Sequence, residues 1–165
     1  MNEAQILHWF YTTALGEVAR NSRVLWPAFE SLHFVGLCVL FGSLLVVDLR
    51  VLGLGKNLIS VSSVMPFIPL AFAAGLLNVV TGISFFCAQP ETYWHNSAFK
   101  WKMALFVFGG LNALFFEFFE RRRLTALPID ADTGSLAKLV ALGSMATWLV
   151  VMILGRTLPY TGSGG

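Results

Sequence analysis

Residues 26–47 read WPAFESLHFVGLCVLFGSLLVV, and this stretch decides the fold. Its only side chains that ionise strongly are Glu30 and His33, and nearly all the others are apolar. A membrane-spanning helix needs about 20 mostly apolar residues, so the stretch predicts a span. Pro27 stands in the first turn, where a proline is tolerated, and Asp48-Leu49-Arg50 closes the run.

Three further apolar blocks follow, at residues 64–86, 99–119 and 136–154. Of the 165 residues, 56% are hydrophobic and 12% are charged, against roughly 25% charged in a soluble domain. Residues 4–22 are too polar to span and predict a helix on the membrane surface. We therefore expect an all-α fold, a four-transmembrane-helix bundle with an N-terminal interfacial helix, as a single domain over residues 1–160. Residues 161–165 resemble a linker or an appended sequence.

Four spans place both termini on one side of the membrane, here called side A, together with the loop at 88–96. Side B then holds the loops at 51–63 and 121–135. Lysine and arginine are nearly balanced between the sides, but Arg121, Arg122 and Arg123 form a tight cluster on side B. Because short positive loops stay in the cytoplasm, we expect a multi-pass membrane protein with side B in the cytoplasm and side A, with both termini, facing the periplasm or the exterior. Asp48 and Arg50 would pair with this arginine cluster as a cytoplasmic cap.

The candidate chemistry rests on three histidines, His8, His33 and His95. His8 and His95 belong to side A, and His33 lies about 10 Å below that surface at 1.5 Å per helical residue. An ionisable side chain inside a span is a functional hypothesis, because leaving it unpaired in hydrocarbon is costly. The alternative is an interhelical hydrogen bond, for example from His33 to Asn78.

Two neighbours of His33 in the sequence favour a ligand role. Gly36, one turn on, opens space beside the imidazole for a flat macrocycle, or lets another helix approach closely. Glu30 shares the face of His33 and is placed to accept the second ring proton, as carboxylates do for metal-bound histidines.

Cationic residues at the side-A ends of the last two spans fit the propionates of a haem, or they reach lipid headgroups. These residues are Lys100, Lys102 and Arg156. Trp148 stands eight residues before Arg156, so the two could form one wall of a pocket. The cysteines, Cys38 and Cys87, lie in apolar runs and favour buried thiols over a disulfide. No Cys-x-x-Cys-His occurs, which excludes covalent c-type haem.

The first span resembles that of a group of small bacterial four-helix membrane proteins. The shared features are Leu32-His33-x-x-Gly36, then Gly42-Ser43, then Asp48-Leu49-Arg50-x-Leu52-Gly53. The likeness continues through Asn96-x-x-Phe99-x-x-Lys102 and Asn112 to Trp148 and Gly155-Arg156, so it covers most of residues 30–160. More distantly, the chain is similar to b-type cytochrome and copper-resistance membrane bundles, in which helix histidines hold haem or copper. Those b cytochromes carry histidines on two or more spans, whereas here only the first span has one.

The resemblance implies a protein of the bacterial inner membrane with both termini periplasmic. It also implies haem b, with His33 as one axial ligand and the haem in the outer half of the bilayer. The second ligand is open among His95, which we favour, His8, Met145, Met152 and a residue of a neighbouring subunit. We expect an electron carrier or an oxidoreductase subunit that forms a homo-oligomer, because small residues such as Gly75, Gly82, Gly109 and Gly110 let helices pack closely. It would exchange electrons with a quinol or a periplasmic partner.

Two other functions stay open. The first is a copper transport or resistance protein that uses His33, His95 or His8 with a methionine or Cys38, since soft sulfur ligands suit copper. The second is a structural or assembly subunit without a cofactor. A net charge of +2 gives no reason to expect a nucleic-acid partner.

Overall fold

The computed structural model describes residues 2–161, and every regular element in this range is a helix. Four helical segments are long and apolar enough to cross a membrane: Leu25–Val51, Val61–Ala88, Ser97–Thr125 and Ser135–Thr161. These findings confirm the predicted all-α bundle with four spans and describe a multi-pass membrane protein.

The spans are longer and less regular than the sequence predicted. The first is α3 (Leu25–Val51). The second has a short helix α4 (Val61–Val64) before α5 (Phe67–Ala88). The third runs from α7 (Ser97–Phe115) through a π-helical turn η1 (Phe116–Glu120) into α8 (Arg121–Thr125). The second span breaks at Pro66, because a proline cannot donate a helical hydrogen bond.

The fourth span is α9 (Ser135–Thr161), and it contains Pro159. Pro159 does not end this helix, although a proline often marks a helix end. A proline so near the C-terminal end costs one backbone hydrogen bond without bending the body of the helix. Thr161 belongs to α9, and the rest of the expected linker, residues 162–165, lies outside the described residues.

The expected surface segment forms two helices rather than one, α1 (Glu3–Tyr11) and α2 (Ala14–Asn21). The break comes from Thr13, whose hydroxyl accepts a hydrogen bond from the Gly16 amide and caps α2. The helix α2 then docks on the C-terminal end of α5. A Cβ atom at Gly16 would lie 2.4 Å from the Cys87 carbonyl oxygen, so only glycine permits this approach.

Arg20 secures the same contact by donating hydrogen bonds to the carbonyls of Cys87 and Ala88, at 3.2 and 3.3 Å. The last carbonyls of a helix have no partner within the helix. Arg20 therefore caps α5 and holds the surface helices at this end of the bundle.

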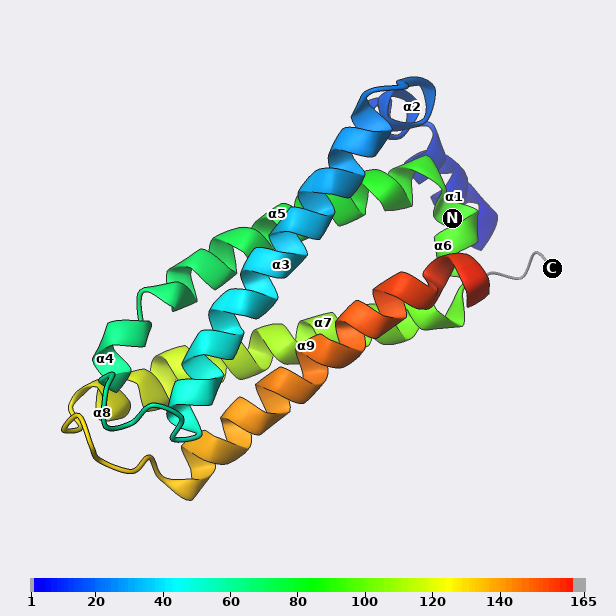
Figure 1. The fold of residues 1–165 in the computed structure, drawn as a ribbon. Coiled ribbons are helices and arrows are strands. Elements are labelled where there is room, and N and C mark those ends of the chain that lie inside the picture. The colour runs from blue at the N-terminus through cyan, green and yellow to red at the C-terminus, as the bar shows by residue number, and fades with distance from the viewer. Residues whose placement is uncertain (1, 162–165) are drawn as a thin grey trace.

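The spans pack as two pairs, α3 with α5 and α7 with α9, and contacts between α3 and α9 join the pairs (Figure 1). The helices α1, α2 and α6 (Pro90–Trp94) lie at one end of the bundle, and α4 and α8 lie at the other (Figure 1). These two ends correspond to side A and side B.

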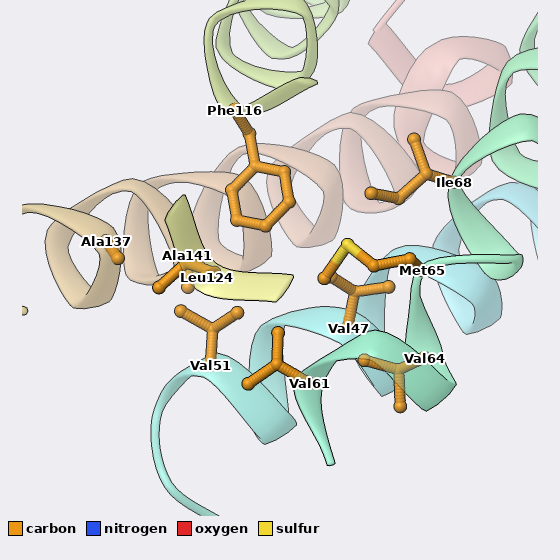
Figure 2. Packing of buried hydrophobic residues seen from close by; sticks show 10 residues of the cluster. All are labelled: Val47, Val51, Val61, Val64, Met65, Ile68, Phe116, Leu124, Ala137 and Ala141. Carbon is orange, nitrogen blue, oxygen red and sulfur yellow. The ribbon is translucent and has the colours of Figure 1, made fainter. Parts of the chain in front are cut away.

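Two clusters of buried apolar side chains hold the bundle together. The side-B cluster joins α3, α4, α5, η1, α8 and α9 (Figure 2) and consists of Val47, Val51, Val61, Val64, Met65, Ile68, Phe116, Leu124, Ala137 and Ala141. The central cluster consists of Leu40, Leu44, Ala71, Ala74, Trp148 and Val151.

Arg50 fastens both side-B loops to the end of α3. It is 3% exposed, and its guanidinium donates to the carbonyls of Ile59 and Ile129. The expected pairing of Asp48 and Arg50 with the arginine cluster is wrong, because Arg121 instead forms an ion pair with Glu117 one turn earlier.

Candidate functional site around His33

His33 is half-buried on α3 and faces α5. Its Nδ1 lies 2.7 Å from the hydroxyl of Thr81. Its ring meets Phe85 edge-on with 5.4 Å between centroids, and a Cβ at Gly82 would lie 3.9 Å from its Cε1. The α5 segment from Thr81 to Phe85 therefore forms the wall against which the imidazole lies.

The hydrogen bonds of Thr81 assign the proton on this ring. The Thr81 hydroxyl lies 2.8 Å from the Leu77 carbonyl of its own helix, and we assign its single proton to that bond. The Thr81 oxygen then accepts from His33 Nδ1–H, which leaves a lone pair on Nε2. Among the described residues, Nε2 has no hydrogen-bond partner. A neutral imidazole with Nδ1–H held and Nε2 free is the form that ligates metals.

Gly36 serves helix packing rather than an open space. A Cβ at this position would lie 2.6 Å from Nδ2 of Asn78 and 3.3 Å from a methyl of Leu77. Of the two readings offered by the sequence, the structure favours the close approach of α3 and α5. Asn78 donates to the Ala74 carbonyl at 2.9 Å, so the hydrogen bond proposed from His33 to Asn78 is replaced by the bond to Thr81.

Glu30 does not orient His33. It is exposed and accepts a hydrogen bond at 3.0 Å from Nε1 of Trp26, one turn before it. The Trp26 ring packs on Phe85, the residue that also contacts His33. The hydroxyl of Thr81 therefore orients the His33 ring, the role that the sequence suggested for the carboxylate of Glu30.

The three candidate cations have different environments. Lys100 and Arg156 are exposed and lie over the rings of Trp94 and Tyr160, at 5.9 and 5.7 Å. Lys102 is half-buried, and its ammonium lies close to Gly155 of α9, 3.4 Å from where a Cβ would stand. Within residues 2–161 this ammonium has neither a hydrogen bond nor an ion pair. Lys102 is therefore the cation that points into the bundle.

Trp148 belongs to the central cluster and is 3% exposed. It packs against Gly109, where a Cβ would lie 3.0 Å from the indole ring, and edge-on against Phe106. Arg156 is exposed, so the two residues do not form one wall together. The Trp148 Nε1–H has no partner among the described residues.

The other histidines lie at the side-A surface. His95 ends α6, is exposed, and its Nε2 lies 3.7 Å from a carboxylate oxygen of Glu3. His8 on α1 lines an open pocket of about 510 Å³ together with Tyr11, Arg20 and Glu91. Within the described range, no group of three or more His, Cys, Asp or Glu side chains comes together as a metal site. Both cysteines are free; Cys87 is buried as expected, whereas Cys38 is exposed.

Tyr93 of α6 stands near these groups at side A. Burial, with a smaller contribution from the charge of Glu30, raises the pKa of its phenol. Its ring packs on Phe99 at 5.2 Å. The phenol therefore stays neutral at physiological pH and fixes the α6–α7 corner by packing.

The sequence did not single out Thr81 and Phe85. A signal existed, because Asn78, Thr81 and Ser84 form a stripe of small polar residues at intervals of three, and all three are buried. Gly75, Asn78 and Gly82, the residues of this helix named from the sequence, do not include the hydroxyl that contacts His33.

Comparison with known proteins places the chain in a family without supplying a function. Neither the curated proteins nor the solved structures include a significant match. A family model described as a family of unknown function matches residues 6–161, and the chain belongs to this family, DUF6644.

Proposed function

We propose that this protein binds haem b in the side-A half of the membrane through Nε2 of His33, and that it works as an electron carrier or an oxidoreductase subunit. The observation that carries the proposal is the His33–Thr81 pair. It holds a neutral imidazole inside an apolar bundle with its second nitrogen free. The bond to Thr81 leaves the lone pair on Nε2 available, and that lone pair is what a metal ligand requires.

Lys102 supports the proposal from the opposite pair of helices. It is half-buried in the side-A half, and an anion would offset the cost of its burial. A haem propionate would supply that anion. When bound, haem b supplies reversible one-electron chemistry at its iron, and the protein tunes it through ligand identity, burial and hydrogen bonds.

His95 remains our proposal for the second axial ligand. His95 lies beside Glu3 at the side-A surface. Either a movement of α6 or the corresponding histidine of a second copy of the chain would therefore have to bring an imidazole to the haem. One haem near side A cannot carry electrons alone across about 30 Å of hydrocarbon. Electrons would pass laterally between copies, or to a quinol or a periplasmic partner.

The homo-oligomer stays a prediction, and the structure changes the residues that support it. Three of the predicted glycines face neighbours within the chain: a Cβ would lie within 4 Å of Leu40 at Gly75, of His33 at Gly82 and of Trp148 at Gly109. Gly42, Gly110 and Gly143 have no other heavy atom within 4 Å of a Cβ position, so they are the ones free to meet a second copy.

The proposed orientation places side B in the bacterial cytoplasm. Asp130 is an exposed residue of the 121–135 loop and suits labelling, whereas Thr133 is buried with its hydroxyl bonded to the Val51 carbonyl. A cysteine at Asp130 should stay unlabelled by an impermeant thiol reagent in intact cells and react after permeabilisation. Cys38→Ser and Cys87→Ser changes remove the background. Labelling in intact cells would reverse the orientation.

Thr81→Val should weaken haem binding about tenfold to a hundredfold, because the isosteric side chain no longer holds His33 Nδ1. Titration of haemin into the purified protein in detergent measures the affinity. Ser84→Ala is the matched control, since Ser84 is a buried hydroxyl of the same helix that bonds only to Val80. Equal haemin affinity in Thr81→Val and wild type would contradict the role given to this pair.

A further inference from the structure

A second polar cluster lies inside the bundle toward side B. Asp48 of α3, Asn112 of α7 and Ser144 of α9 line a cavity of about 20 Å³. Asp48 is fifteen residues beyond His33 on the same helix, so the two sites are about 22 Å apart. The remaining walls are apolar: Leu44, Val47, Ile68, Ala113, Phe116 and Val140.

Asp48 enters this cavity without a counter-ion. The residue is 5% exposed, and among residues 2–161 its Oδ2 has no hydrogen-bond partner. Arg50 lies two positions further on α3, but its Nε and Nη2 donate to the carbonyls of Ile59 and Ile129, and its Nη1 has no hydrogen-bond partner among the described residues. A buried carboxylate without a cation is costly, so a positively charged occupant of the cavity would stabilise it.

The other two polar residues add oxygen ligands. Asn112 donates from Nδ2 to the Val140 carbonyl at 3.2 Å, which fixes its amide and leaves Oδ1 free. Ser144 is 5% exposed and lines the same cavity as Asp48. Oxygen ligands from three different helices suit a hard cation.

The size of the cavity selects among cations. A space of about 20 Å³ holds one species of the size of a water molecule. The three side chains offer at most four oxygens and one negative charge, which suits a monovalent cation rather than calcium, with its six to eight oxygens, or magnesium, which keeps several waters. We propose that Asp48, Asn112 and Ser144 form a binding site for one sodium ion. The ion neutralises Asp48 and joins α3, α7 and α9.

The side-B cluster packs beside this site. Val47, Ile68 and Phe116 belong both to the cavity wall and to the cluster (Figure 2). Phe116 also begins the π-helical turn of the third span, a local irregularity that occurs frequently at functional sites.

The test is binding of radioactive sodium to the purified full chain in detergent, with choline chloride keeping the ionic strength constant. Wild type should bind about one ion per chain, and its Tm should rise with sodium but not with choline. Asp48→Asn, which has the same shape, should weaken sodium binding by more than about tenfold, because it removes the charge that holds the ion. Ser144→Ala should weaken it as well.

Asp132→Asn is the matched control. It removes the same charge from an exposed residue that pairs with Lys138 outside the cavity, so sodium affinity should not change. Absence of saturable sodium binding in wild type would overturn the proposal, as would unchanged binding in Asp48→Asn. A carboxyl that binds only a proton would give a Tm independent of sodium, and this too would overturn it. If Asp48→Asn does not fold, the proposal is judged by two other results: the number of sodium ions bound per wild-type chain and the sodium affinity of Ser144→Ala.

Discussion

His33→Ala should lose nearly all bound haem while the protein remains in the membrane. Insertion depends on four apolar helices and not on one side chain. Haem retention depends on a ligand to iron, and His33 is the histidine that lies within a span with a free Nε2. Haem content per chain, measured after purification from cells grown with ample haem precursor, gives the result.

His8→Ala is the matched control, because it removes an exposed imidazole from the surface helix α1. Its haem content should equal that of wild type. His95→Ala reports the second ligand: a shift of the iron to high spin would assign His95, and an unchanged spectrum would exclude it. If His33 only makes an interhelical bond, His33→Ala should cost on the order of 0.6 kcal/mol of stability and leave any spectrum unchanged. That outcome would end the ligand assignment.

Trp148→Ala should be the most destabilising single substitution in the centre of the bundle. The indole is 3% exposed and fills the space between Gly109, Phe106 and the rest of the central cluster. Truncating a buried aromatic side chain costs about 3–5 kcal/mol, because the cavity it leaves does not collapse fully. Unfolding of the purified protein by heat or denaturant measures the loss.

Trp148→Phe is the conservative control. It keeps most of the ring contacts, and it removes an Nε1–H that has no partner among the described residues. We expect this variant to lose much less stability than Trp148→Ala and to keep its haem. A Trp148→Ala protein as stable as wild type, but without haem, would contradict the packing role and return Trp148 to the wall of a cofactor pocket.

The four spans could be predicted because membrane insertion depends on the length and apolarity of a segment, and both are visible in the sequence. The run 26–47 lies wholly inside α3, and the other three blocks lie inside the remaining spans. The ends of the spans were less predictable. A proline often marks a helix end, but Pro159 lies within α9, where it removes one backbone hydrogen bond near the C-terminal end.

The surface helices show a second limit of prediction from the sequence. Their polarity predicted a segment outside the hydrocarbon, yet its division at Thr13 depends on a cap, and its docking depends on Gly16 and Arg20. Both residues act through the carbonyls at the end of α5, which are distant in the sequence. Tertiary contacts of this kind are not contained in a local pattern.

Only part of the candidate site, His33 itself, could be predicted from the sequence. A histidine inside an apolar run stands out, and the structure gives His33 a defined partner. The partner itself, the packing role of Gly36 and the inward position of Lys102 depend on which faces of α3, α5, α7 and α9 meet. Periodicity alone does not fix that rotation. For the same reason, Asp48 looked like part of a surface cap, although it points into an internal cavity.

The absorption spectrum of the purified wild-type protein tests the central proposal most directly. The full chain, expressed in bacteria with ample haem precursor and purified in mild detergent, should be red. It should show a Soret band, and dithionite should sharpen bands in the visible region, with about one haem per chain. The His33→Ala protein prepared in parallel should be colourless. A colourless wild-type protein that also fails to bind added haemin would contradict haem binding, and bound copper in that preparation would assign the site to a metal ion instead.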